Sequence, residues 1–342
     1  MLIIGISGLV LTEEEREWIR TPCVSGVILF SRNFDSRMQV CELVAAIRAE
    51  REGPFVLSVD QEGGPVQRFR SGFTELPALA RLGELYERDR AQAVALAEEH
   101  AWVMASEMRA LDIDISFAPV LDLKRGNLAI GERAFHVDPA VVSDLGLAYL
   151  RGMRLAGMAA TIKHFPGHGS VLQDTHFDRA TDSRPLEVLR TTDLLPFGDA
   201  IVAGAEAVMM AHVAYPLVDA NPAGYSRVWI QDILRDEYQF GGVVISDDIS
   251  MVAAESAGGI GARIAAHSSA GCDLILVCRP GVVAESLLAV RDQLPCPASR
   301  VATLCGGIAA DWQSLNDNPQ YARFVARLST LGNPRWVAAG TP

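Results

Sequence analysis

One stretch of the chain, residues 161–178, gathers side chains that could carry out acid–base or metal chemistry. Its sequence is TIKHFPGHGSVLQDTHFD, which contains Lys163, His164, His168, Asp174 and His176. The apolar run before these residues, Gly157–Ile162, predicts a buried strand, and the proline and glycines that follow favour a loop. We therefore expect Lys163 and His164 at the end of a strand and the remaining polar residues on the loop, an arrangement by which α/β enzymes present catalytic groups.

Three interpretations of this cluster are open from the stretch alone. The histidines could satisfy local backbone groups in a polar loop. They could bind zinc together with Asp174, although the spacing of His164, His168 and His176 matches no tight zinc motif and no cysteine pair supports it. The cluster could also be a sugar-binding and acid–base loop, and the rest of the chain favours this third interpretation.

Length and composition favour a soluble α/β barrel. The chain has 342 residues, 49% of them hydrophobic, and a (β/α)₈ barrel takes about 250 residues or more. No apolar run reaches the roughly 18 residues of a membrane helix, and no basic region precedes the apolar N-terminus, so we expect a cytoplasmic protein. The six cysteines form no Cys-x-x-Cys motif and are expected to be reduced thiols. The net charge of −12 disfavours nucleic acid or an anionic membrane as a partner.

Short apolar runs alternate with amphipathic segments along the chain. The predicted strands are Leu2–Ile6, Gly26–Phe30, Phe55–Val59, Ile113–Ala118, Ala159–Ile162, Ala207–Ala211, Gly242–Ile245 and Leu274–Val277. The predicted helices are Glu13–Arg20, Ser36–Glu50, Asp89–Leu111, Pro139–Ala156, Pro185–Ala203, Val228–Glu237, Gly261–Ala270 and Gly281–Leu294, with helix starts signalled at Ser36 and Asp138. Eight such repeats are typical of a parallel barrel.

We therefore expect one (β/α)₈ TIM-type barrel domain over residues 1–342, with a short helical C-terminal extension. The extension holds two further predicted helices, Ser299–Ser314 and Gln320–Leu328. A doubly wound sheet is the alternative, but no Gly-x-Gly-x-x-Gly motif follows the first strand.

Polar residues follow several predicted strands directly where the strands end. They are Asp60 and Arg68 after the third strand, Asp122 and Arg133 after the fourth, Lys163 and His164 after the fifth, His212 after the sixth, and Asp247 and Asp248 after the seventh. In a barrel these ends face one rim, where active sites lie. Each residue alone has an ordinary explanation, since Asp248 could cap a helix and Asp122 could serve loop packing. Independent caps would not converge on one rim, so we expect a site there.

Several of these blocks resemble bacterial β-N-acetylhexosaminidases of glycoside hydrolase family 3. The blocks are Val59–Gly64 with Val66–Phe69, Ala129–Arg133, Lys163–Gly169, Asp174–His176 and Ser246–Asp248. The resemblance extends over nearly the whole chain, and Lys-His-Phe-Pro-Gly-His-Gly is highly specific. It implies a (β/α)₈ barrel that hydrolyses terminal, non-reducing β-linked N-acetylglucosamine. The implied substrate is N-acetylglucosaminyl-1,6-anhydro-N-acetylmuramic acid, with or without peptide, in cytoplasmic peptidoglycan recycling.

The same resemblance assigns a role to each site residue. It places Asp247 as the nucleophile, His176 as the acid/base and Asp174 as the partner of His176. The family's sugar-binding positions fall on Asp60, Arg68, Arg133, Lys163 and His164. No metal or organic cofactor is implied, and the expected partner is a small muropeptide or amino sugar bound by a monomer or weak dimer. One departure is the end of the first strand, Gly5–Gly8, where relatives often carry acidic residues.

Elementary chemistry agrees in part with these roles. A retaining glycosidase needs a carboxylate below the anomeric carbon and a proton donor beside the leaving oxygen. Larger family members take that donor from a second domain, so here we expect it on a loop of the barrel. Rival functions are a glycoside phosphorylase on the same sugars, a non-catalytic sugar-binding barrel, and a metal-dependent hydrolase. Dependence on orthophosphate would identify the phosphorylase. Loss of Asp247 or His176 would indicate the non-catalytic barrel, but both residues are present. Insensitivity to a chelator would exclude the metal-dependent hydrolase.

Overall fold

Eight short parallel strands form the centre of the molecule. The computed structural model describes residues 1–171, 180–307 and 310–332. The central strands of this part of the chain are β1 (Leu2–Gly5), β2 (Val24–Leu29), β3 (Val56–Val59), β6 (Ile115–Ser116), β7 (Thr161–Phe165), β9 (Ala207–Met210), β12 (Val243–Ile245) and β13 (Ile275–Val277). Each overlaps one of the eight predicted strands.

Two runs of paired strands and two single bridges close these strands into a barrel. One run has the order β13–β1–β2–β3–β6, and the other has the order β12–β9–β7. The bridge between Val120 and Lys163 joins the segment after β6 to β7, and the bridge between Ile245 and Leu274 joins β12 to the start of β13. Every central strand therefore has a neighbour on both sides, which confirms the predicted (β/α)₈ barrel.

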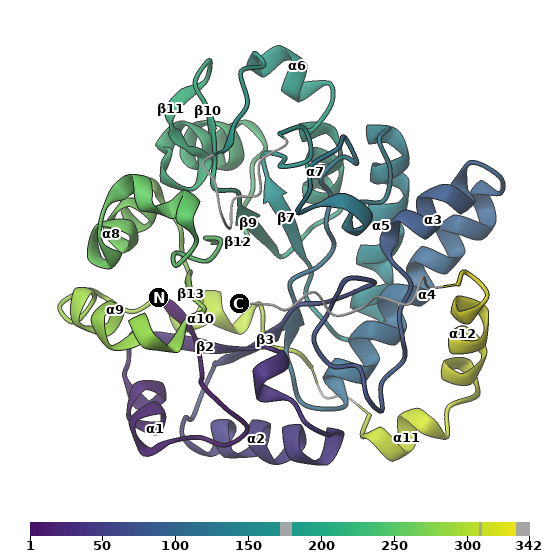
Figure 1. The fold of residues 1–342 in the computed structure, drawn as a ribbon, viewed down its shortest axis with the longest axis horizontal. Helices are drawn as coiled ribbons and strands as arrows, with labels where there is room; N and C mark the ends of the chain where they lie inside the picture. Colours follow the sequence, from purple (N-terminus) through teal and green to yellow (C-terminus); the bar gives the residue numbers. More distant parts are fainter. Residues whose placement is uncertain (172–179, 308–309, 333–342) are drawn as a thin grey trace.

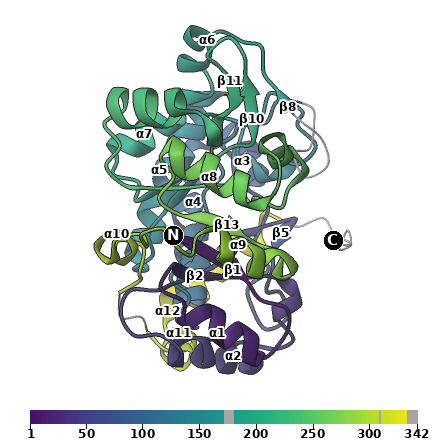
Figure 2. The same ribbon diagram turned by 90° about the vertical axis from the view of Figure 1, so that its left-hand side faces the viewer.

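Alternation along the strands separates the barrel interior from the layer under the helices. On β12, for example, Val243 and Ile245 belong to the inner cluster, whereas Val244 belongs to the outer one. This period of two is the one that strand geometry imposes. Val301 and Leu304, in or just after the short helix α10 (Ala298–Ala302), join the inner cluster. In Figure 2, α10 lies at the end of the barrel opposite the β5 label, so its apolar residues close the amino end.

A ring of helices surrounds the barrel (Figure 1). They are α1 (Glu13–Arg20), α2 (Arg37–Ala49), α3 (Leu79–Tyr86), α4 (Arg90–Arg109), α5 (Pro139–Leu155), α6 (Leu186–Arg190), α7 (Leu194–Val202), α8 (Ile260–Ala270) and α9 (Val283–Ala289), with a π-helix at Val228–Glu237. The predicted starts of two of them are confirmed, because Ser36 accepts a hydrogen bond from Gln39 N and Asp138 accepts one from Ala140 N. No helix of the described residues is long and apolar enough to span a membrane.

Two long helices expected from the sequence are each interrupted. The segment Pro185–Ala203 forms α6 and α7, because the Thr191 and Thr192 hydroxyls donate to the carbonyl of Val188 and end α6. The segment Ser299–Ser314 forms α10 and then α11 (Trp312–Asn316). Between them, Gly306 lies where an added Cβ would come within 2.2 Å of the Arg109 guanidinium. The prediction of one continuous helix was therefore wrong at both places.

Strand β7 also differs from its prediction. It runs from Thr161 to Phe165, so Lys163 and His164 lie inside the strand rather than after its end. Two polar residues can occupy a buried strand because acidic partners from neighbouring strands surround them, as described below. Elements absent from the prediction are the helix α3, the hairpin of β4 (Gln61–Gly63) and β5 (Val66–Gln67), and a small sheet of β8 (Ala180–Thr181), β10 (Val213–Tyr215) and β11 (Asp219–Pro222).

The C-terminal helices pack on the outside of α4. In α12 (Pro319–Ser329), the Phe324 ring meets the Trp102 ring at 5.4 Å, and Tyr321 donates a hydrogen bond of 2.6 Å to Glu107. Figure 1 shows α11 and α12 at the edge of the molecule beside α4. We propose that the chain is one barrel domain with these helices as its extension.

Candidate active site

A cavity of about 410 Å³ lies at the carboxyl ends of the barrel strands. Its lining continues the inward alternation of the barrel, because Ile28 is followed two residues later by Phe30 and Leu276 by Cys278. By the same period, Asp247 follows the inward-facing Ile245 two residues beyond it. The rigid barrel therefore determines the direction of the functional side chains.

Six predicted site residues line this one cavity. They are Asp60, Arg68, Arg133, Lys163, His164 and Asp247. They come from segments after β3, β6 and β12 and from within β7, so barrel closure brings together positions almost 190 residues apart. The other two, Asp174 and His176, lie outside the described residues. The roles of all eight remain predictions.

Asp60 and Arg68 meet because a tight hairpin folds the chain back on itself. Gln61 of β4 pairs with Gln67 of β5, which places the two flanking residues opposite each other. The turn between them needs two glycines, since Gly63 and Gly64 have φ of +94° and +54°. The Arg68 guanidinium lies 3.3 Å from the Asp60 carboxylate.

A buried ion-pair cluster stands at one wall of the cavity. Asp60, Lys163 and Arg133 line the wall, Glu62 pairs with two of them without lining it, and we call these four residues the rim cluster. Lys163 Nζ contacts Asp60 at 3.0 Å and Glu62 at 2.6 Å. Two nitrogens of Arg133 donate to the two oxygens of Glu62, at 2.8 and 2.9 Å. Because such a paired geometry holds the guanidinium plane, Glu62 orients both Lys163 and Arg133.

The charges of the rim cluster keep its carboxylates ionised. Burial alone would raise the pKa of Asp60, but Lys163 and Arg68 outweigh it and hold this pKa below its ordinary value. Burial is likewise the largest effect on Glu62, and the charges of Arg133 and Lys163 reverse it, so its pKa is also lowered. The wall therefore presents one ionised acceptor, Asp60, next to the cationic donors Lys163 and Arg133, a combination suited to sugar hydroxyl and amide groups.

A second buried carboxylate, Asp122, organises the histidine end of β7. It lies 2.7 Å from His164 Nδ1 and accepts a hydrogen bond of 2.6 Å from the backbone N–H of His168. Burial is the largest effect on the pKa of Asp122, but His164 and His168 lower that pKa. Burial lowers the pKa of His168 to about 4, so its ring is neutral near pH 7. Asp122 thus sets the orientation of His164 in the cavity.

Asp247 and Asp248 are adjacent in sequence but differ in their contacts. Asp248 accepts from Ser250 N at 3.0 Å and from Cys278 N at 3.1 Å, so it holds the loops after β12 and β13. These contacts give Asp248 a structural role, but not that of a helix cap, because the N-cap positions of the next two helices are Met251 and Gly259. Asp247 is half-buried, lines the cavity, and has a carboxylate oxygen 2.8 Å from Asp248 N.

Sequence reasoning assigned no role to Glu62 and left Asp122 as a possible packing residue. A signal was present for Glu62, which stands two residues after Asp60 and would share its face in an extended segment.

The loop at Gly5–Gly8, where relatives often carry acidic residues, has a local role in this chain, because Ser7 N and Ser7 Oγ donate to Glu15 at 2.6 and 2.7 Å. Ser7 therefore anchors its loop to α1.

The zinc alternative depends on residues beyond the described part of the chain. Within residues 1–171, 180–307 and 310–332, no group of three or more His, Cys, Asp or Glu side chains could hold a metal ion. Of its four candidate ligands, the structure describes His164 and His168, and both contact Asp122.

Comparisons with known proteins agree with this geometry. The chain matches the family model "Glycosyl hydrolase family 3 N terminal domain" over residues 4–305. A β-hexosaminidase of Stenotrophomonas maltophilia (strain R551-3) is 58% identical to it over 333 residues, 97% of this chain and 99% of the relative.

Solved structures give the same result. Native NagZ from Neisseria gonorrhoeae is 40% identical with a TM-score of 0.90, over 97% of this chain and 98% of that one. NagZ from the same organism in complex with N-trifluoroacetyl-D-glucosamine has a TM-score of 0.89 and 40% identity, over 96% and 97% of the two chains. The predicted family is confirmed: the chain belongs to glycosyl hydrolase family 3, as one of its β-hexosaminidases.

Proposed function

We propose that this β-hexosaminidase releases terminal, non-reducing β-linked N-acetylglucosamine from peptidoglycan fragments in the cytoplasm. The proposed substrate is N-acetylglucosaminyl-1,6-anhydro-N-acetylmuramic acid, with or without peptide, and the proposed role is cell-wall recycling. The observation that carries the proposal is the meeting of Asp60, Arg68, Arg133, Lys163, His164 and Asp247 around one cavity. A volume of about 410 Å³ lies in the range of small-molecule sites.

In the first step of the proposed mechanism, a carboxylate oxygen of Asp247 attacks the anomeric carbon. The bond from that carbon to the aglycone oxygen breaks, and this oxygen takes a proton from the protonated His176 imidazole. Asp174, two residues before His176, would orient the imidazole and favour its protonated form.

In the second step, water attacks the anomeric carbon of the glycosyl-enzyme. The neutral imidazole accepts the proton of that water, and the bond to Asp247 breaks. N-Acetylglucosamine then leaves with its β configuration retained. Arg68, Arg133, Lys163 and His164 would hold the sugar through both steps, with Asp60 accepting from its hydroxyls.

A fluorinated slow substrate followed by peptide mass spectrometry tests the covalent route. We expect the label on the peptide that contains Asp247. The competing route uses the 2-acetamido oxygen of the substrate as the nucleophile. No label on that peptide, together with strong inhibition by an oxazoline mimic, would show that this competing route operates.

Substrate choice tests the proposed sugar. Because the cavity offers several hydrogen-bonding groups, we expect roughly 100-fold preference for an aryl N-acetylglucosaminide over the matched glucoside. Comparable rates on the two would contradict the proposal. Product analysis with and without orthophosphate separates hydrolysis from phosphorolysis, since a phosphorylase would release the sugar 1-phosphate.

Leaving-group dependence tests His176. A dinitrophenyl glycoside needs almost no protonation, whereas the disaccharide needs much. The His176→Ala enzyme should therefore lose far more rate on the disaccharide than in single-turnover glycosylation by the dinitrophenyl glycoside. Equal losses on the two substrates would mean that another group is the acid.

A further inference from the structure

Five cationic side chains line the cavity, and they fall into two groups. Arg68, Arg133 and Lys163 are each paired with a carboxylate of Asp60 or Glu62. Arg32 and Arg279 also line the cavity, yet neither makes an ion pair with any carboxylate among residues 1–171, 180–307 and 310–332. In a chain with 42 acidic and 30 basic residues, two arginines of one pocket without an acidic partner call for an explanation.

Arg32 is held in place by backbone carbonyls. Its Nε donates to Ile6 O at 2.8 Å, and its Nη2 donates to Cys278 O at 2.8 Å. Its guanidinium also lies 4.4 Å from the centroid of the Phe30 ring. A guanidinium has five N–H donors, so these contacts fix its position and leave donors for a ligand.

Arg279 lies beside Arg32 at the mouth of the cavity. It directly follows Cys278, whose carbonyl Arg32 binds, and the order β13–β1–β2 places the two loops on one side of the barrel. Both arginines are exposed, whereas Lys163 is 2% exposed. Within the described residues, the Arg279 side chain makes no hydrogen bond or ion pair, so it can turn towards a ligand without losing a contact.

We propose that Arg279 and Arg32 form an anion-binding subsite that takes a carboxylate of the aglycone. This inference rests on the proposed function, in which the paired inner cations hold the terminal sugar and the aglycone occupies the mouth. Muramic acid carries a carboxylate on its lactyl ether, and an attached peptide carries its own. Guanidinium groups bind carboxylates through two parallel hydrogen bonds, which neutral aglycones cannot provide.

The test compares the disaccharide acid with its neutral lactyl amide. For the wild-type enzyme we expect kcat/KM to be about 10-fold higher for the acid at low salt, the size of a charge-assisted hydrogen-bond effect. In R279Q this ratio should fall to near 1. The control is R88Q, which removes the same charge from an exposed arginine in the turn between α3 and α4 and should keep the wild-type ratio.

A third substrate distinguishes the two sources of the carboxylate. In the peptide-bearing disaccharide the lactyl carboxyl is an amide, so only peptide carboxylates remain. A loss in R279Q confined to the disaccharide acid would assign the subsite to the lactyl group. A loss confined to the peptide-bearing substrate would assign it to the peptide. Either result supports the subsite.

The inference would be overturned, with N-acetylglucosamine still released, if R279Q kept the acid-to-amide ratio of R88Q and also kept the wild-type kcat/KM on the peptide-bearing substrate. Failure of the proposed function looks different, because the wild-type enzyme would then release no N-acetylglucosamine from the disaccharides or from a neutral aryl glycoside. R32K provides a second variant, since lysine keeps the charge but loses the fork. R32K should lower the ratio of kcat/KM for the disaccharide acid to that for the lactyl amide. The melting temperature of R32K shows whether the backbone contacts of Arg32 are needed for folding.

Discussion

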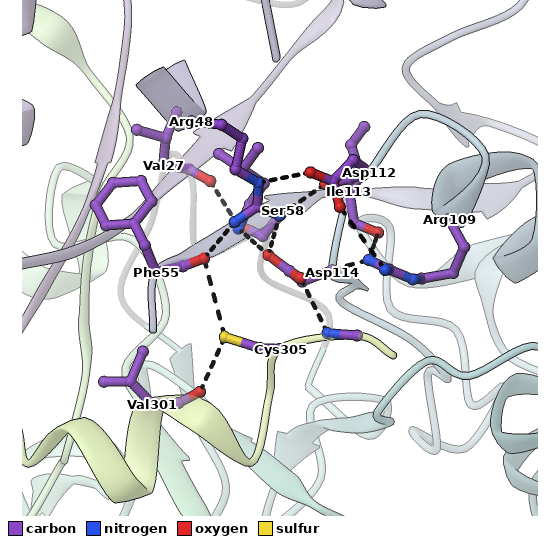
Figure 3. Close-up of polar contacts among 12 residues, drawn as sticks. Val27, Arg48, Phe55, Ser58, Arg109, Asp112, Ile113, Asp114, Val301 and Cys305 are labelled. Atoms are coloured by element: carbon purple, nitrogen blue, oxygen red, sulfur yellow. Dashed lines mark hydrogen bonds and ion pairs between the residues drawn. The ribbon is translucent and has the colours of Figure 1, made fainter. Parts of the chain in front are cut away.

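The two ends of the barrel each contain buried charges, but they use them differently. At the carboxyl end, three residues of the rim cluster, Asp60, Lys163 and Arg133, line the cavity. At the other end, Arg48, Arg109, Asp112 and Asp114 form what we call the amino-end cluster, which Figure 3 shows together with Phe55 and Cys305.

In the amino-end cluster, Asp114 has its acceptor sites filled by the protein. One oxygen accepts from Leu57 N and Arg48, both at 2.7 Å, and the other accepts from Gly306 N at 2.9 Å and Arg109 at 3.3 Å. Asp114 is 2% exposed. This carboxylate therefore fastens the chain after α10 to β3, α2 and α4, and has no capacity for a ligand.

In the rim cluster, Asp60 is less fully occupied. Within the described residues, each of its oxygens accepts one hydrogen bond, from Lys163 at 3.0 Å and from Arg68 at 3.3 Å, although a carboxylate can accept about four. The same type of ion pair thus stabilises the fold at Asp114, where backbone N–H groups fill the remaining acceptor sites. At Asp60 it can bind a ligand, because acceptor sites remain open towards the cavity. Five measurements test this difference.

The largest expected effect follows from changing Asp247 to Asn. If Asp247 is the nucleophile, kcat should fall by roughly 10⁴-fold or more, as for other nucleophile replacements. The melting temperature should stay close to that of the wild type, because the amide has the same shape. Steady-state kinetics and calorimetry check both. Residual activity within tenfold of the wild type would assign the reaction to another group.

Changing Glu62 to Gln should damage both activity and stability. The change removes the charge that pairs with Lys163 and Arg133, and breaking a buried pair costs about 3–5 kcal/mol. Displacement of the two cations should also lower kcat/KM by roughly 100-fold. Urea unfolding and kinetics on the aryl N-acetylglucosaminide measure the two losses. Full activity in a destabilised variant would mean that Glu62, like Asp114, contributes to stability and not to catalysis.

Changing Asp114 to Asn should affect stability alone. The variant loses the charge facing Arg48 and Arg109, so we expect a loss of about 3 kcal/mol in the free energy of unfolding. Because the rim lies at the opposite end of the barrel, kcat/KM at 25 °C should stay within about twofold of the wild type. A large loss of kcat/KM in the folded variant would show that the two ends are coupled.

Mild acid should weaken the fold through buried histidines rather than through Asp60 or Glu62 of the rim cluster. Burial lowers the pKa of His100 and of His168 to about 4, so between pH 6.5 and 4 the unfolded chain binds protons that the folded chain does not. Stability therefore falls as the pH falls, by about 2 kcal/mol at pH 5 for each such histidine.

Asp60 and Glu62 contribute little to this loss between pH 7 and 5. The pKa values of Asp60 and Glu62 are lowered, so their stabilisation persists above the unfolded values and is lost only in stronger acid. Melting temperatures measured from pH 7 to 5 test the histidine contribution. In the His100→Gln variant, the melting temperature should fall less steeply with decreasing pH than in the wild type. An unchanged dependence of the melting temperature on pH in that variant would show that His100 does not cause the loss of stability in mild acid.

The smallest effect is expected for Asp112→Asn. The Asp112 side chain is 59% exposed and pairs with Arg48 at 2.9 Å, and such surface pairs contribute about 0–1 kcal/mol. Its φ of 60° is one that asparagine also adopts readily. Equilibrium unfolding should therefore place this variant near the wild type, in contrast to Asp114→Asn. A loss as large as that of Asp114→Asn would mean that the whole amino-end cluster acts as one unit.

The sequence by itself determined the fold class and the positions that meet at the rim. Short continuous apolar runs between amphipathic segments predicted all eight barrel strands, because a parallel strand that is buried on both faces is apolar along its whole length. The blocks around Asp60, Lys163 and Asp247 indicated the family for a similar reason, since each is short and continuous. Capping at Ser36 and Asp138 is equally local.

Only the tertiary structure decided which charges are partners. Glu62 meets Arg133 across 71 residues, and Asp114 meets Gly306 across 192. The break between α10 and α11 likewise occurs where Gly306 meets Arg109, a contact that only the folded chain shows, although the adjacent Gly306 and Gly307 already signal a turn in the sequence. Closure of the barrel brings these residues together. It therefore leaves Asp114 enclosed by donors at one end, and Arg32 and Arg279 beside an open cavity at the other.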